Sequence, residues 1–240
     1  MTFEGKGKPT EQPAHKIKQS KNIQRIKYLA IGGIISPILL VIVTMVPTLL
    51  DPSYSPISMT ISESQAIGAP HKPLVDAIMV VYDVSFIPVA IALHKGIRAT
   101  GKLWEKIAPA ALILVGVISV PLTLLFPLDI EALSGNISTP GSILHFNLAA
   151  VVASLMMLTP IAFWFRMRKD KRWYNYRTYS LASFAAVLIL GILTFALAGH
   201  EGSASDGDYR GLLQRLTIGS VLQWQLVMAI GLIRLPKCTA

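Results

Sequence analysis

The sequence predicts an all-α polytopic integral membrane protein, with six transmembrane helices in one bundle and both termini in the cytoplasm. Three observations lead to this prediction. First, hydrophobic residues make up 52% of the 240 residues and charged residues only 15%, whereas about 25% of residues are charged in an ordinary soluble domain. Second, the apolar residues fall into six long runs. Third, the basic residues gather between alternate runs. The composition excludes a disordered chain and a disulfide-rich secreted domain.

Each of the six runs is long enough to cross a bilayer, because a hydrocarbon core about 30 Å thick requires about 20 apolar helical residues. Prolines within the runs predict kinks, since neighbouring helices of a bundle can satisfy the carbonyl groups that a proline leaves free. One transmembrane domain over 28–240 is therefore expected. Its spans are predicted at about 28–50, 74–94, 107–126, 141–165, 178–199 and 211–235.

Lysine and arginine set the predicted orientation, because cytoplasmic connections carry an excess of these residues. Nineteen of the 22 Lys and Arg residues lie in the N-terminal tail, the second and fourth connections and the C-terminal end. We therefore expect a multi-pass protein of the plasma membrane. Residues 1–27 are expected to form a basic, disordered cytoplasmic tail. The net charge of +9 follows from this pattern, so the bilayer is the expected partner and nucleic acid is not.

Polar residues inside the spans are the first candidates for a function, because a charge near the bilayer midplane costs at least about 2.5 to 3.5 kcal/mol. Asp76 and Asp83 are seven residues apart and so share one face of the second span. They could form a proton or cation site, supply a catalytic carboxylate, or join two helices by hydrogen bonds. Arg215 begins the last span at a similar depth, so we expect it to pair with Asp76.

The inferred depths place several ionisable groups in one layer just below the outer surface, and we predict a polar site there. The catalytic candidates are Asp76, Asp129, His145 and Arg215. The binding candidates are Glu63, Asp83, His200, Glu201 and Gln214.

A divalent metal such as zinc is one cofactor that this layer could hold, since two histidines and a carboxylate leave a coordination position for water. The metal candidates are His145, His200 and Asp129, although no local zinc-binding motif is present. Acid–base chemistry without a metal is equally allowed. Haem is less favoured, because His145 and His94 fall at opposite ends of their spans.

Several short segments, in this order and spacing, resemble the membrane family known as domain of unknown function 998. The resemblance covers about residues 28–235 and implies a six-helix membrane bundle without supplying an activity. It is carried by Tyr54-Ser55-Pro56, Ile61-Ser62-Glu63, Phe126-Pro127-Leu128-Asp129, His145 and Gly211-Leu212-Leu213-Gln214-Arg215.

Three classes of function remain open from the sequence. The first is a membrane hydrolase or transferase that acts on a lipid or small amphiphile through the outer polar site. The second is a proton- or ion-coupled transporter that uses Asp83 and Asp76. The third is a non-catalytic membrane scaffold. The pattern makes no prediction about oligomeric state.

Overall fold

The computed structural model describes residues 12–98, 102–129, 139–197 and 209–235, and within these ranges the chain is helical and contains no strand. Six helices are long and apolar enough to cross a membrane. The predicted fold class is therefore confirmed, and each predicted span corresponds to one of these helices.

The first span is part of a long rod made by α1 (Gln12–Ala30) and α2 (Gly32–Leu50), whose apolar portion runs over Ser20–Leu50. Residues 12–27, which were expected to be disordered, are thus helical. The other spans are α3 (Lys72–Gly96), α4 (Lys102–Leu125), α6 (Pro140–Arg166), α7 (Tyr174–Leu197) and α8 (Arg210–Ile233). Two short 3₁₀ turns, η1 (Glu63–Gln65) and η2 (Lys171–Trp173), lie in the connections.

Local sequence signals explain why two helices begin slightly before the predicted spans. Thr139 is the N-cap of α6, and its hydroxyl accepts a hydrogen bond from the Ser142 N–H at 3.3 Å. Pro140 follows at the first helical position, where its missing N–H and fixed φ are tolerated. A proline also occupies the first turn of α3. These residues extend each helix beyond its apolar run.

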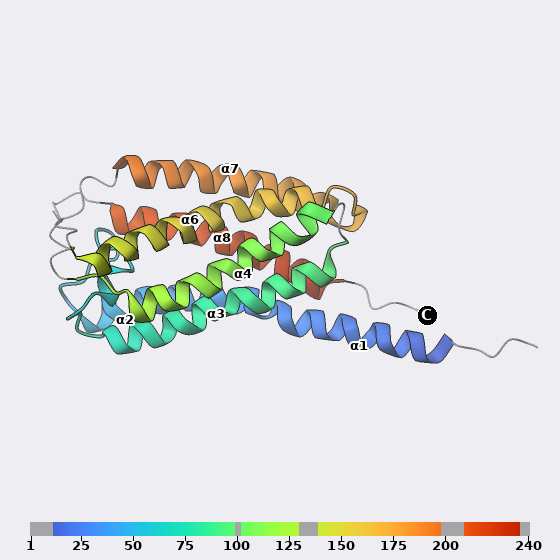
Figure 1. Cartoon of the computed structure of the whole chain (residues 1–240), viewed down its shortest axis with the longest axis horizontal. Coiled ribbons are helices and arrows are strands. Elements are labelled where there is room, and N and C mark those ends of the chain that lie inside the picture. The colour runs from blue at the N-terminus through green and yellow to red at the C-terminus, as the bar shows by residue number, and fades with distance from the viewer. Residues whose placement is uncertain (1–11, 99–101, 130–138, 198–208, 236–240) are drawn as a thin grey trace, which may run out of the picture.

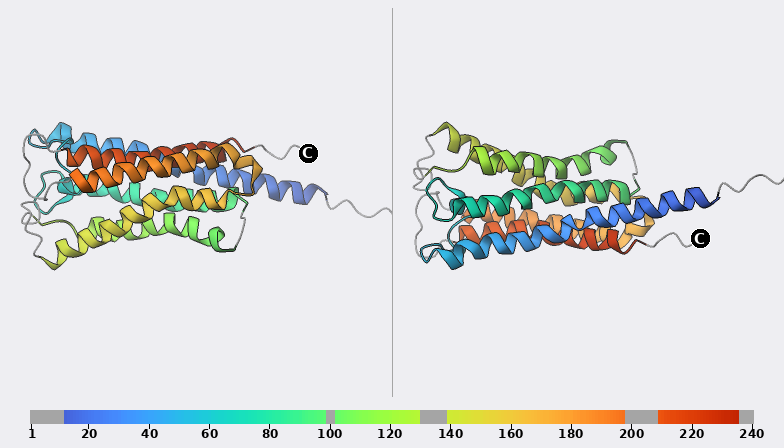
Figure 2. Two further views of the ribbon diagram at one scale, coloured as in Figure 1. Left: turned by 90° about the horizontal axis from the view of Figure 1, so that it is seen from above. Right: turned by 90° about the horizontal axis from the view of Figure 1, so that it is seen from below.

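The six spans form a closed ring in chain order. Each of α2, α3, α4, α6 and α7 packs against the next helix, and α8 closes the ring by packing against α2. The helices run roughly side by side in all three views (Figure 1; Figure 2). The α1 helix packs against α3 and α8 and extends beyond the bundle (Figure 1). This order requires only short connections between neighbouring helices.

Large apolar side chains fill the centre of the ring. Trp224 of α8, Phe163 of α6 and Phe86 of α3 are fully buried, and the rings of Phe163 and Trp224 lie 5.5 Å apart. Gly33 lets α2 approach α8 closely, because a Cβ atom there would lie 2.7 Å from the Cβ of Ala229. Small residues at such crossings strengthen helix packing in membranes.

A buried polar network joins three of the helices near their middle. The hydroxyl groups of Ser36 on α2 and Ser85 on α3 lie 2.6 Å apart. The Gln225 amide of α8 donates a hydrogen bond to Ser36 Oγ at 2.8 Å. Such hydrogen bonds between membrane helices contribute about 0.6 kcal/mol each. The network fixes the register of α2, α3 and α8.

The two ends of the bundle differ, and we name them by what they contain. At the cap end, the residues between α2 and α3, here called the cap (51–71), lie over the helix ends. The opposite end carries Arg166 at the end of α6 and the α6–α7 connection with Arg168, Lys169, Lys171 and Arg172, and we call it the basic end. The first described residues of α1 and the end of α8 also lie at the basic end (Figure 1). Its cytoplasmic location stays a prediction.

Candidate functional site

The cap is a folded segment with its own buried residues. Its residues Tyr54, Ile61 and Ala66 are buried. Asp51 begins the cap with a turn, in which its carboxylate accepts hydrogen bonds from the Ser53 hydroxyl at 2.6 Å and the Ser53 N–H at 2.9 Å. These hydrogen bonds from Ser53 hold the pKa of Asp51 below its usual value. The cap therefore has a defined conformation over the bundle.

The first turn of α8 is the platform on which the cap rests. The Leu212 N–H donates to the Ile57 carbonyl at 2.8 Å, and the Gln214 side-chain oxygen accepts from the Ile61 N–H at 2.9 Å. Gly211 allows this approach, because a Cβ atom there would lie only 2.2 Å from the Met59 carbonyl oxygen. The segment from Gly211 to Arg215 thus positions the backbone of the cap.

Arg215 of α8 binds the cap through its guanidinium group. Its guanidinium donates to the carbonyls of Met59 at 2.7 Å and Pro56 at 2.9 Å, and also to the Tyr54 hydroxyl. The same group lies 5.8 Å from the centre of the Tyr54 ring. Burial raises the pKa of Tyr54, against the opposing influence of Arg215, so the phenol stays neutral. Arg215 therefore connects the last span to the cap.

Glu63 forms hydrogen bonds within the cap. Its N–H donates to Thr60 Oγ1 at 3.3 Å, and its carboxylate accepts a hydrogen bond from the Thr60 N–H. This reciprocal pair has the pattern of a capping box and lies at the start of η1, whose N-cap is Ser62. The Glu63 carboxylate also lies 3.7 Å from the Arg210 guanidinium. Glu63 therefore stabilises the turn and attaches it to α8.

Asp76 does not pair with Arg215, so that part of the prediction is wrong. Its carboxylate forms an ion pair with Lys72 at 2.6 Å, one helical turn earlier, and accepts a hydrogen bond from the Gln65 amide at 3.1 Å. The reason is geometric, because Lys72 lies at the i,i+4 position of the same helix and Arg215 is occupied by cap carbonyls. Asp76 thus attaches η1 to α3.

Asp129 and His145 form a second group, which connects α4 to α6. The Asp129 carboxylate accepts hydrogen bonds from the Thr139 hydroxyl and, at 2.9 Å, from the Ser142 hydroxyl. These two hydrogen bonds hold the pKa of Asp129 below its usual value. His145 is buried, and its Nδ1 lies 2.6 Å from the Phe126 carbonyl. Because a carbonyl only accepts, Nδ1 carries the proton in this contact.

The cap and the Asp129–His145 group are in contact through a backbone hydrogen bond and a small apolar cluster. The Ile67 N–H of the cap donates to the Leu128 carbonyl at 2.8 Å. Ala66 and Leu128 are buried together, with Phe146 packed against them. The cap end is therefore one connected unit. The catalytic candidates Asp76, Asp129, His145 and Arg215 nevertheless form no hydrogen bond or ion pair with one another within the described residues.

Asp83 lies apart from this unit, deeper in α3. It is 1% exposed, and its carboxylate accepts a hydrogen bond from Thr123 of α4 at 3.1 Å. Helix α4 approaches this position closely, since a Cβ atom at Gly116 would lie 2.6 Å from the Asp83 carbonyl oxygen. Asp83 therefore sits at the α3–α4 contact.

A metal site is not assembled from the residues that the structure describes. No group of three or more His, Cys, Asp or Glu side chains within those ranges could hold a metal ion. His200 and Glu201 lie outside the described residues, so zinc coordination that includes His200 stays a prediction. His145 and His94 lie at opposite ends of the bundle, on α6 and α3, so they cannot hold one haem between them.

Comparison with known proteins identifies the family of this chain. A profile described as protein of unknown function (DUF998) matches residues 34–231. The chain belongs to this family. No curated protein and no solved structure matches it.

Membership of the DUF998 family confirms the resemblance seen in the sequence, and the structure gives its short segments a physical role. Tyr54, Glu63, Gln214 and Arg215 lie together at the contact between cap and α8. Sequence reasoning missed Arg210 as the partner of Glu63, and Lys72 and Gln65 as the partners of Asp76. Two signals could have found part of this arrangement: the four-residue spacing of Lys72 and Asp76, and the Thr-x-x-Glu pattern at residues 60–63.

Proposed function

We propose that this DUF998 protein is a non-catalytic membrane scaffold, which presents the folded cap as a binding surface for another protein at the outer face of the membrane. The observation that carries the proposal is the engagement of the Arg215 guanidinium. All three of its nitrogen atoms donate hydrogen bonds: Nε to Thr44, Nη1 to three carbonyl groups, and Nη2 to Tyr54.

An arginine used in this way has a structural role. A guanidinium has five N–H donors in a rigid fork, and an arginine that stabilises a transition state must direct some of them toward a substrate. Gln214 and Glu63 are likewise bound to cap backbone N–H groups. These polar residues therefore hold the backbone of the cap in place, which supports a role for the cap as a binding surface.

The cap also offers apolar side chains to a partner. Ile57 is 50% exposed and Ile67 is 48% exposed. Apolar residues at the centre of a contact, surrounded by polar ones, are typical of protein interfaces. Ile57 is held by the Leu212 N–H of α8, so its position depends on the same platform as Arg215.

A photo-crosslinking residue at position 57, introduced in living cells, tests this proposal. We expect a discrete adduct with a second protein, and we expect Arg215→Ala to abolish it because the cap loses its attachment. Position 144, on the exposed side of α6 near the cap end, is the matched control and should give lipid adducts only. Absence of a protein adduct at position 57 would contradict the proposal.

Purified protein supplies the opposing test. Turnover of a phospholipid or ester by the wild type, lost in Arg215→Lys while the cap remains protected from hydrogen exchange, would establish catalysis and overturn the scaffold. The lysine keeps the charge but not the planar fork. This comparison therefore separates a chemical role of Arg215 from a structural one.

A second candidate function, proton-coupled transport, is supported by Asp83. An ionisable residue that is 1% exposed at membrane depth is costly, and Thr123 is its one hydrogen-bond partner among the described residues. Proton flux into liposomes that contain the protein tests this function. Transport requires flux that Asp83→Asn abolishes, and equal flux in both forms would exclude it.

A further inference from the structure

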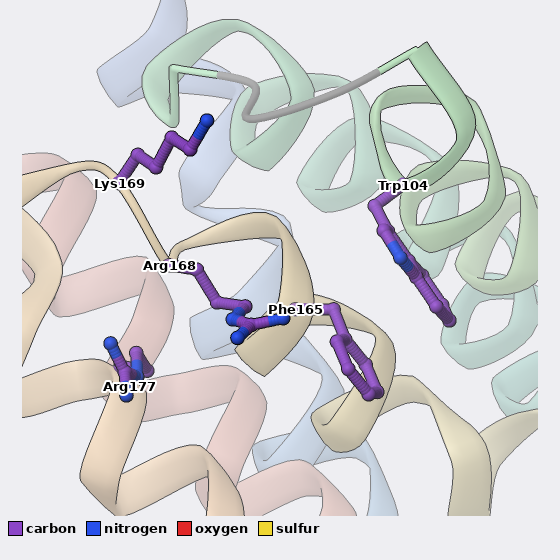
Figure 3. Close-up of a pocket in the computed structure, with 5 residues that line it drawn as sticks. All are labelled: Trp104, Phe165, Arg168, Lys169 and Arg177. Atoms are coloured by element: carbon purple, nitrogen blue, oxygen red, sulfur yellow. The ribbon is translucent and has the colours of Figure 1, made fainter.

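The basic end contains a pocket that the cap end and the proposed scaffold role do not use. It has a volume of about 480 Å³ and is lined by Trp104, Phe165, Arg168, Lys169 and Arg177. These residues come from the start of α4, the end of α6, the α6–α7 connection and the start of α7. Figure 3 shows the two aromatic rings on one side and the cationic side chains on the other.

The charge of this pocket is not neutralised by nearby acids. Arg168, Lys169 and Arg177 form no ion pair within the described residues, and no acidic residue lines the pocket. Asp170, which follows Lys169 in the chain, has other partners. Asp170 binds Arg172 at 2.7 Å and accepts a hydrogen bond from the Arg98 N–H at 3.0 Å. Three cations therefore face one cavity.

Aromatic rings hold two of these cations in place. The Arg168 guanidinium lies 5.4 Å from the centre of the Trp164 ring, and the Arg177 guanidinium lies 5.3 Å from the same ring. Such cation–π contacts fix the plane of a guanidinium while leaving its edge N–H groups available. Two guanidinium groups beside one ring are thus arranged before any ligand arrives.

The other side of the pocket is apolar. The rings of Trp104 and Phe165 are stacked 4.4 Å apart with an angle of 9° between their planes. Both residues lie at the ends of membrane spans, where aromatic side chains meet the bilayer interface. A ligand here would place an anionic group on the arginines and an apolar part along the rings.

We propose that this pocket binds the phosphate group of an anionic ligand, with a phospholipid headgroup as the favoured source. Arginine forks match phosphate oxygens bidentately, and basic pockets between membrane helices bind anionic headgroups on the side predicted here to be cytoplasmic. The stacked rings favour a lipid over a soluble phosphate, because the acyl chains can continue along α4 and α6.

Full-length protein in phosphatidylcholine nanodiscs doped with phosphatidylglycerol provides the test, with retained lipids counted by native mass spectrometry. We expect the wild type to retain phosphatidylglycerol selectively, and the double variant Arg168→Gln/Arg177→Gln to bind it about tenfold or more weakly. The matched control, Lys95→Gln/Arg98→Gln, removes two exposed charges from the same end of the bundle and should bind like the wild type.

A second arm distinguishes the source of the phosphate. Inorganic phosphate is titrated by calorimetry into protein held in pure phosphatidylcholine nanodiscs. Phosphate binding that depends on Arg168 and Arg177, without selective lipid retention, would support the same site with a soluble ligand. Should the double variant fail to fold, Lys169→Gln alone removes one exposed charge and should weaken binding about fivefold.

Two results would overturn the proposal. One is a wild type that neither prefers phosphatidylglycerol nor binds phosphate. The other is an equal loss in the pocket variant and the Lys95/Arg98 control, because the effect would then come from the general positive charge of this end. Neither result bears on the cap, so the scaffold proposal would stand or fall separately.

Discussion

The cap end and the basic end both use an arginine to join a connection to the helices, but they differ in the charge that remains. Arg215 donates to the carbonyls of Pro56 and Met59 at the cap end. Arg166 donates to the carbonyls of His94 at 2.7 Å and Glu105 at 2.6 Å at the basic end. Each guanidinium donates hydrogen bonds to backbone carbonyls, which the hydrocarbon of a bilayer cannot do.

The difference lies in the neighbours of these two residues. At the cap end, Arg210 faces Glu63 and Lys72 faces Asp76, so the positive charge of these two residues is balanced locally. At the basic end, Arg168, Lys169 and Arg177 have no such partner within the described residues. The ion pairs of the cap end hold the cap in place, whereas these three cations of the basic end are available to an anionic ligand. The following experiments test this difference between the two ends.

The largest effect is expected from Arg166→Ala. Arg166 is 1% exposed, and its removal leaves the carbonyls of His94, Ile97 and Glu105 without their donor. Orphaned buried acceptors cost about 1 to 3 kcal/mol each, so the free energy of unfolding should fall by about 3 kcal/mol or more. Denaturation in detergent, followed by circular dichroism, measures this. Arg168→Ala is the control and should change stability by less than about 1 kcal/mol.

Arg215→Ala should have a large but local effect. The cap loses the donor to Pro56 and Met59, so hydrogen exchange of residues 54–61 should speed up at least tenfold while the helix cores remain protected. Hydrogen-exchange mass spectrometry measures both regions at once. Unchanged protection of the cap would show that Arg215 does not hold it, and would weaken the contrast between the two ends.

Gly211→Ala tests the close approach of cap and α8 with a control in the same helix. The new Cβ would meet the Met59 carbonyl oxygen at 2.2 Å, which forces the cap away and should cost about 1 to 3 kcal/mol. A Cβ at Gly219 meets nothing within 4 Å, so Gly219→Ala should be neutral or stabilise the helix by up to about 1 kcal/mol. Thermal unfolding compares the two variants, and equal effects would refute the proposed contact.

The smallest effect concerns pH. The folded pKa of Asp129 is depressed by its hydrogen bonds from Thr139 and Ser142. Its contribution to stability is therefore present above the unfolded pKa of about 3.9 and is lost as the pH falls through the lower folded value. Protection of the first turn of α6 from hydrogen exchange should decrease over this acidic range. Asp129→Asn should show the weaker protection already at neutral pH and little further change on acidification.

Local patterns in the sequence predict the spans and part of the candidate site. The six spans were predictable because 20 apolar residues in a row are too costly to leave in water. The placement of Arg215 at the cap end followed from its depth, whereas Glu63 and Gln214 were indicated by the family resemblance. The partner of Asp76 was missed, because depth alone does not rank Lys72 on the same helix against Arg215 on another. Asp129 and Ser142 are 13 residues apart, so no helical spacing predicts their contact.

By itself, the sequence determined that six helices are long and apolar enough to cross a membrane, and which residues had to leave the lipid. Both follow from the free energy of transferring side chains and backbone into hydrocarbon, which is a sum over local residues. Only the tertiary structure decided that α8 closes the ring against α2, and that the Arg215 guanidinium reaches the cap carbonyls. Hydrogen bonds depend on distance and direction between segments far apart in the chain, and these exist only once the bundle has packed.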